Sequence, residues 1–210
     1  MKEDQNNRIS DKPEYELRNT VVLLIGIPAV GKYTTAKEIC RLTCAKLVDN
    51  MLIAYPIVSI IGFDGMDSFP FPSGAVEHIE RIRDAVLTVI HDYCPPDDSF
   101  VFTNVLEAGK VSDEEQFHRI EKLAIDRGAS FFPVWLTCNE DKIRERKVRP
   151  DRRARFKDTD VSNVARISRD VKMFEPRHPN ALTVDTSEGD CGQTARRIIA
   201  HIQQMLDNHA

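Results

Sequence analysis

Long hydrophobic runs are missing from this sequence of 210 residues. The segment that comes nearest to one, 21–30, is ten residues long and contains Gly26 and Pro28, whereas a transmembrane helix needs about 20 apolar residues. The first nineteen residues are rich in charged side chains and contain no apolar core of the kind found in secretory signals. We therefore expect a cytoplasmic protein with neither a membrane segment nor a secretion signal.

The sequence also lacks the cysteine spacing and the excess of positive charge that several classes of protein require. The five cysteines are odd in number and no two are separated by just two residues, so the pattern favours neither a zinc site nor a disulfide framework. The 29 Lys and Arg residues are outnumbered by 33 Asp and Glu residues, which gives a net charge of −4. This balance does not favour a general nucleic-acid coat protein or a polybasic membrane binder.

Strand-like and helix-like segments alternate along the chain. Apolar runs predict strands at 20–25, 45–48, 99–105, 131–138 and 181–185. Apolar positions at helical spacing and flanking end signals predict helices at about 32–43, 75–93, 112–127, 161–174 and 192–206. The stretch 56–74, which is rich in proline, glycine and phenylalanine, is expected to be a long loop. The alternation predicts a three-layer α/β fold with a five-stranded parallel sheet, in a single domain over residues 20–210 behind a polar lead-in, 1–19.

A phosphate-binding motif follows the first predicted strand. Residues 26–32 read GIPAVGK and fit G-x-x-x-x-G-K between a strand and a helix, which is the context that the motif requires. Its glycines allow successive backbone N–H groups to turn inward at a helix N-terminus, and its lysine supplies a cation for phosphate oxygens. We expect the nucleotide phosphates to be bound by Gly26, Pro28, Ala29, Val30, Gly31, Lys32, Tyr33 and Thr34.

The position after the lysine departs from the usual motif. A Ser or Thr hydroxyl normally binds Mg²⁺ there, but this chain has Tyr33, followed by Thr34 and Thr35. Because a phenol cannot replace a short hydroxyl, Thr34 is the candidate for contact with a phosphate or with Mg²⁺. The strand at 99–105 also lacks a terminal aspartate of the Walker B kind, with Asn104 and Glu107 as possible substitutes.

A carboxylate, Asp49, ends the second predicted strand. If that strand is a neighbour of the loop-bearing strand, Asp49 would lie beside the phosphate loop. It could then hold a Mg²⁺-bound water or accept the proton of an attacking hydroxyl. The alternative is an aspartate that caps the following turn.

A strongly basic segment lies between the fourth predicted strand and the last one. Residues 142–157 contain nine Lys and Arg residues against two acidic ones. Such a run is either a solvated helix face, a nucleic-acid patch or a lid that closes over a transferring phosphoryl group. Its position in a protein with a phosphate loop favours a lid, over about 142–160. Arg149 and Arg153, near Pro150, are its candidate catalytic residues, and Arg144 is a candidate nucleotide contact.

Together these motifs make the chain similar to small P-loop kinases of the shikimate/gluconate kinase and chloramphenicol-phosphotransferase type. It also resembles bacterial AAA-type ATP-binding proteins with a G-P-P-A-V-G-K loop, and shares the Pro28 position and the Lys32-x-Thr34 spacing with adenylate-kinase-type loops. The resemblance runs from about residue 20 to residue 206. It implies a P-loop NTPase/kinase fold, ATP on residues 26–34, Mg²⁺ near Thr34 and Asp49, and an adenine bordered by Thr186 and Ser187.

Two departures from these relatives bear on the substrate and the mechanism. Shikimate kinases carry a second acid two residues after the strand-end aspartate, where this chain has Met51, so shikimate is not favoured as the acceptor. AAA+ motors carry a Walker B acid pair that is missing here.

We therefore expect an ATP-dependent phosphotransferase that moves the γ-phosphoryl group of ATP to a hydroxyl of a small-molecule acceptor. One alternative is a nucleoside or polynucleotide kinase, whose acceptor phosphates the basic segment would bind. Another is a nucleotide-binding ATPase switch that phosphorylates no acceptor. The expected partners are ATP and the acceptor, and nothing in the sequence indicates an oligomeric state.

Overall fold

A computed structural model describes residues 13–63, 72–153 and 157–208 of the chain, and these residues contain a five-stranded sheet. Its order is β2-β3-β1-β4-β5 and every pairing is parallel. The strands are β1 (Thr20–Ile25), β2 (Lys46–Asp49), β3 (Phe100–Asn104), β4 (Ser130–Thr137) and β5 (Leu182–Asp185). The predicted five-stranded parallel sheet is confirmed.

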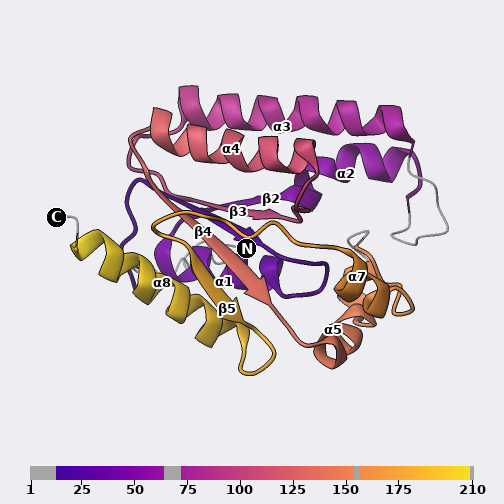
Figure 1. The fold of residues 1–210 in the computed structure, drawn as a ribbon. Helices are drawn as coiled ribbons and strands as arrows, with labels where there is room; N and C mark the ends of the chain where they lie inside the picture. Colours follow the sequence, from indigo (N-terminus) through magenta and orange to yellow (C-terminus); the bar gives the residue numbers. More distant parts are fainter. Residues whose placement is uncertain (1–12, 64–71, 154–156, 209–210) are drawn as a thin grey trace, which may run out of the picture.

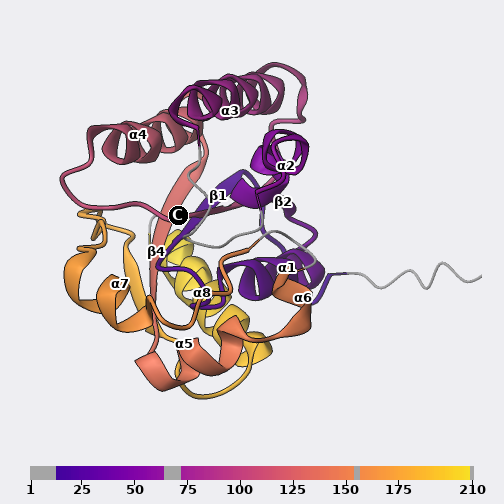
Figure 2. The same ribbon diagram turned by 90° about the vertical axis from the view of Figure 1, so that its right-hand side faces the viewer.

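Helices cover both faces of this sheet (Figure 1). One face carries α1 (Lys32–Thr43) and α8 (Cys191–Asp207), and the other carries α2 (Asn50–Ile60), α3 (Ser73–Tyr93) and α4 (Val111–Asp126). Three shorter helices, α5 (Glu140–Lys147), α6 (Pro150–Arg153) and α7 (Val164–Asp170), gather beyond the carboxyl ends of the strands (Figure 2). The three-layer α/β architecture is therefore also confirmed, and the basic segment predicted as a lid lies at the edge of the sheet where the strands end.

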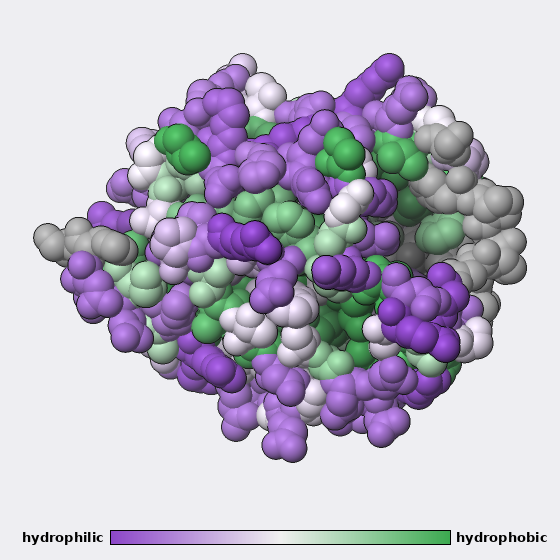
Figure 3. Space-filling view, in the orientation of Figure 1, coloured by the Kyte–Doolittle hydropathy of each residue, from purple (hydrophilic) through white to green (hydrophobic). Residues whose placement is uncertain are grey.

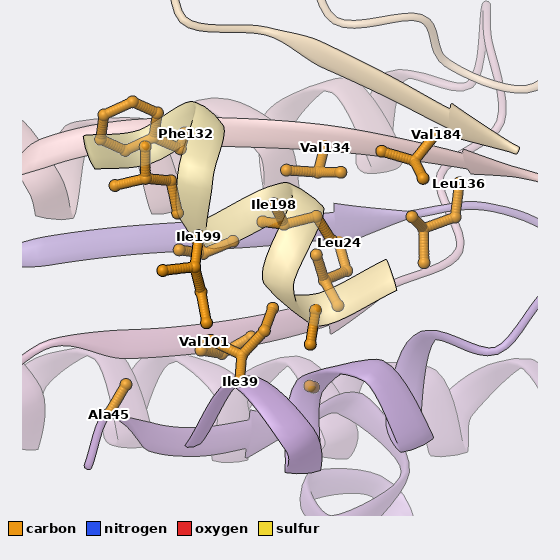
Figure 4. Close-up of a cluster of buried hydrophobic side chains, with 14 of the residues drawn as sticks. Leu24, Ile39, Ala45, Val101, Phe132, Val134, Leu136, Val184, Ile198 and Ile199 are labelled. Carbon is orange, nitrogen blue, oxygen red and sulfur yellow. The ribbon is translucent and has the colours of Figure 1, made fainter. Parts of the chain in front are cut away.

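The core surrounds β1, which lies in the centre of the sheet. All six of its residues are buried, because side chains on both of its faces meet helices. On one face, Ile39 of α1 and Ile198 of α8 pack around Leu24, and all three are fully buried (Figure 4). On the other face, side chains of α3 and α4 form a second apolar cluster. The phosphate loop thus begins at the end of the most buried strand.

The molecular surface is mainly hydrophilic in the view of Figure 3, and smaller hydrophobic patches show among the hydrophilic residues. No helix in the described ranges is both long enough and apolar enough to cross a bilayer. All five cysteines are free thiols.

The loop expected at 56–74 was wrong in its first part, because residues up to Ile60 belong to helix α2. The helix contains Pro56, and its sequence, NMLIAYPIVSI, is apolar almost all round, so neither helical periodicity nor helix propensity predicts it. Its stability comes from packing against α3, where Ala54 and Val58 form a small buried cluster with Ile79. Part of the expected loop, 64–71, lies outside the described residues. The helix expected at 161–174 is shorter in the structure, where α7 ends at Asp170.

Candidate active site

The phosphate loop connects β1 to α1 at the point where the strand order reverses, because β1 lies between β3 and β4. This is where open α/β sheets usually bind ligands. The loop runs very close to β4: a Cβ atom on Gly26 would lie 2.6 Å from the carbonyl oxygen of Leu136. Gly31 has a φ of 108° and Ala29 a φ of 69°. The loop thus holds positive φ angles even at Ala29, a residue type that disfavours them.

Lys32 lies inside this loop. Its Nζ donates hydrogen bonds to the carbonyl oxygens of Gly26, at 2.6 Å, and Ile27, at 2.9 Å. Burial of the ammonium is the main cause that lowers the pKa of Lys32 to about 7; the positive charges of Lys157 and Arg152 contribute to this lowering, while Asp49 opposes it. The loop therefore holds a cation whose full charge is restored when an anion binds beside it.

Arg146 joins the lid to the phosphate loop. One of its guanidinium nitrogens donates to the carbonyl oxygen of Val30 at 3.0 Å and to the hydroxyl of Thr186 at 3.1 Å, and the other donates to the carbonyl oxygen of Thr186 at 2.6 Å. The Thr186 hydroxyl in turn donates to the carbonyl oxygen of Val30 at 2.7 Å. Arg146 was not predicted as a site residue, because in the sequence it is only one member of a basic run.

Asp49 is buried at the end of β2. Its Oδ1 accepts a hydrogen bond from the Thr103 hydroxyl at 2.5 Å, and its Oδ2 lies 4.0 Å from the Nζ of Lys157. The strand order corrects one premise of the sequence analysis: β3 separates β2 from β1, so the two strands are not neighbours. Asp49 nevertheless faces the same cavity as Lys32.

That cavity has a volume of about 560 Å³, which lies in the range of small-molecule sites. Ten of the residues predicted to form the site line it, namely Pro28, Ala29, Val30, Gly31, Lys32, Tyr33, Thr34, Asp49, Arg149 and Thr186. The cavity is also lined by described residues that were not predicted as site residues, including Asn50, Met51, Thr103, Lys142, Arg146, Arg152 and Lys157.

Three predicted site residues do not line this cavity. Gly26 contributes its carbonyl oxygen to Lys32 instead. Arg144 extends along the lid, where it donates to the carbonyl oxygen of Val161 and pairs with Glu140. The Ser187 hydroxyl donates to Asp185 and accepts from the backbone of the α5 N-cap residue. One more predicted site residue, Arg153, has a side chain that lies outside the described part of the structure.

The cations of the lid are heavily committed to partners within the chain. Lys147 is fully buried and donates to Asp158, at 2.5 Å, and to the backbone carbonyl of Asp160. Arg152 donates twice to the carbonyl oxygen of Asp158, at 2.7 and 3.1 Å. These bonds hold residues 158–160 against α5 and α6.

The oxygen atoms of the cavity suit Mg²⁺. Magnesium prefers carboxylate and hydroxyl oxygens and usually keeps several waters beside one or two protein ligands and the substrate phosphates. Asp49, Thr34 and Thr35, which carry oxygen atoms of these kinds, all line the cavity. The Thr34 hydroxyl donates to the carbonyl oxygen of Gly31, which leaves its own lone pairs for a ligand. Among the described residues there is no group of three or more His, Cys, Asp or Glu that could bind a metal by itself.

The fold has many solved counterparts. APS kinase from Mycobacterium tuberculosis, in complex with AMPPNP and APS, aligns over 89% of this chain and 99% of its own with a TM-score of 0.55 and 16% identity. A gluconokinase from Sinorhizobium meliloti aligns over 90% and 95% with a TM-score of 0.56 and 13% identity. Shikimate kinase from Acinetobacter baumannii, in complex with shikimate, aligns over 90% and 94% with a TM-score of 0.50 and 15% identity.

This is the fold of the small P-loop kinases. The fold implied by the sequence resemblance is therefore confirmed. No protein-family model matches the sequence, and a search of curated proteins gives no significant match. At identities of 13 to 16% the counterparts establish the fold, so the roles of individual residues rest on the geometry of this site.

Proposed function

We propose that the protein is an ATP-dependent phosphotransferase that moves the γ-phosphoryl group of ATP to a hydroxyl of a small-molecule acceptor. The phosphate loop and Lys32 would bind the β- and γ-phosphates, and Thr34 would hold Mg²⁺, which supplies charge neutralisation on the phosphates when bound. The counterparts of the same fold include kinases named for small acceptors. A cytoplasmic location remains the prediction of the sequence.

One observation carries this proposal. A buried carboxylate, Asp49, faces the phosphate-loop lysine, Lys32, across the same cavity, and its charge acts on the pKa of that lysine. The hydrogen bond from Thr103 fixes one oxygen of Asp49, and the other lies 4.0 Å from the Nζ of Lys157. A phosphoryl donor bound at Lys32 and a proton acceptor, Asp49, would thus meet in one cavity.

The proposed reaction balances within this site. The acceptor hydroxyl oxygen forms a bond to the γ-phosphorus, and the bond from that phosphorus to the β–γ bridging oxygen breaks, so that ADP leaves with the electron pair. The proton of the hydroxyl passes to the carboxylate of Asp49. The lysine and arginine side chains around the cavity offset the negative charge on the transferring group.

The structure does not favour a nucleic-acid acceptor. Four described cations of the basic segment that suggested one are paired with acids of the chain: Lys142 and Arg149 pair with Glu145, Arg144 pairs with Glu140, and Lys147 pairs with Asp158. Cations compensated in this way release few counterions when they meet a polyanion, so they would contribute little to its affinity.

Radiolabel transfer tests the proposal. The protein is incubated with Mg²⁺, ATP labelled in the γ-phosphate and a panel of acceptors that includes sugar acids, cyclitols, amino alcohols, nucleosides and an oligonucleotide with a free 5′-hydroxyl. We expect label in one class of small molecule, and a loss of at least 100-fold in rate in Lys32→Ala and Asp49→Asn. Asp97→Asn, which changes an aspartate whose side chain is 78% exposed, serves as the matched control.

Three other results would point elsewhere. Undiminished transfer in Lys32→Ala would contradict the proposal. Label released only to water would favour the ATPase switch. Label on the oligonucleotide, with a steep dependence on salt, would favour the polynucleotide kinase.

A further inference from the structure

Lys157, in the predicted lid, lies between the phosphate loop and the proposed base. Its side chain is 16% exposed, and its Nζ is 4.2 Å from the centre of the Tyr33 ring and 4.0 Å from Oδ2 of Asp49. All three residues line the same cavity. The ammonium of Lys157 therefore occupies the space between the residue that follows Lys32 and the carboxylate that would accept the proton.

The other described cations of the lid that line the cavity are directed to different partners. Lys142 and Arg149 pair with Glu145, and the Arg149 side chain is 54% exposed. Arg146 binds backbone oxygens of the phosphate loop and of Thr186. Arg152 binds the backbone of Asp158. Among these cations, Lys157 is the one placed against Asp49.

The backbone holds Lys157 in this position. Its N–H donates to the carbonyl oxygen of Arg152 at 3.1 Å. The next residue, Asp158, is bound through its carboxylate by the buried Lys147 and through its carbonyl oxygen by Arg152. The charge is thus fixed by contacts that do not involve a ligand, which is the arrangement that makes electrostatic stabilisation effective.

The electrostatics of the site call for an anion beside this lysine. Lys32 and Lys157 bring two ammonium groups to the same cavity, where like charges repel each other. Asp49, whose Oδ2 lies 4.0 Å from the Nζ of Lys157, offsets part of this positive charge. A phosphoryl group between the two lysines would relieve the remainder, because each ammonium has three N–H donors for its oxygens.

Building on the proposed function, we propose that Lys157 is a catalytic residue whose ammonium contacts the γ-phosphoryl group, and that Tyr33 is a positioning residue whose ring holds Lys157 in place. The face of an aromatic ring attracts a cation at this distance. This assignment gives a role to the tyrosine that stands where a Ser or Thr is usual. Lys157 keeps its proton throughout and forms no covalent bond, since it acts by donating hydrogen bonds to the phosphoryl oxygens.

Calorimetric titration of two nucleotides, each with Mg²⁺, tests this inference. AMPPNP carries a γ-phosphoryl group and ADP does not, so a residue that contacts this group affects only the first. We expect Lys157→Gln to weaken AMPPNP binding at least tenfold and to leave ADP binding within about twofold. Tyr33→Leu should show the same selective loss, whereas Tyr33→Phe, which keeps the ring face, should resemble the wild type. Lys172→Gln, at an exposed residue outside the cavity, is the control.

The remaining outcomes overturn the inference in distinguishable ways. Equal weakening of both nucleotides by Lys157→Gln, or no weakening of either, would refute a contact with the γ-phosphoryl group and leave the proposed function standing. If the wild type binds neither nucleotide, the proposed function and this inference both fail. Thermal melting of each variant identifies a folding defect, and if Tyr33→Leu does not fold, Lys157→Gln decides the outcome.

Discussion

Replacing Lys32 with methionine should change the pH dependence of stability by a definite amount. The pKa of Lys32 is about 7 in the folded protein, chiefly because its ammonium is buried, against an ordinary value of 10.5. Between these two pH values the unfolded chain binds one more proton at this residue than the folded protein does. Stability therefore rises with pH across this window, and the contribution of Lys32 is most unfavourable at pH 7 and below.

The size of the effect follows from these two values. A difference of one bound proton changes the free energy of unfolding by about 1.4 kcal/mol per pH unit, so Lys32 adds up to about 3 kcal/mol of stability to the wild type between pH 7 and pH 10. Lys32→Met lacks this dependence. It also loses the hydrogen bonds to Gly26 and Ile27, but that loss is nearly the same at every pH and does not alter the slope.

Urea unfolding of both proteins at pH values from 7 to 10 measures the difference. We expect the free energy of unfolding of the variant, relative to that of the wild type, to be highest at pH 7. This difference should fall by up to about 3 kcal/mol by pH 10. Lys122→Met, which removes a lysine with a 72% exposed side chain, should run parallel to the wild type. If the curves of Lys32→Met and wild type are parallel as well, the ammonium is not held at a lowered pKa and the description of the loop is wrong.

Two further predictions concern the frame of the site. Gly26→Ala should lower the free energy of unfolding by about 1–3 kcal/mol in urea titrations, because the new Cβ would meet the Leu136 carbonyl oxygen. Gly74→Ala is the control: a Cβ at this position meets no other atom, so this substitution should not be destabilising. Lys147→Met should lower it by roughly 3 kcal/mol, because Asp158 loses its buried partner. A loss no larger than about 0.5 kcal/mol would show that this pair does not hold the lid.

Much of the fold could be predicted from the sequence because its signals are local. A strand buried on both faces leaves a continuous apolar run, as in β1, and the phosphate loop needs glycines and a lysine at fixed spacing. Asp49 could be located because a strand-end carboxylate in a parallel sheet lies at the ligand-binding edge. Helix α2 could not be predicted, since its stability depends on α3 rather than on its own periodicity.

The lid shows the limit of sequence reasoning most clearly. The composition of residues 142–157 reveals the excess of cations, but nothing local distinguishes Arg146, whose partner Val30 is 116 residues away, from Arg144, which turns along the lid. The contact of Lys157 with Tyr33 likewise joins distant parts of the chain. One lid cation contacts the phosphate loop, another lies against Asp49, and others bind residues of the lid itself. Tertiary packing alone decides which cation makes which contact.

Nucleotide binding by the phosphate loop is the central claim, and calorimetric titration of the whole chain with AMPPNP and Mg²⁺ tests it most directly. We predict Mg²⁺-dependent binding in the micromolar range by the wild type and its loss in Lys32→Ala, with the variant still folded by circular dichroism. No binding by the wild type, or equal binding by the variant, would contradict the claim that this cavity holds a nucleoside triphosphate.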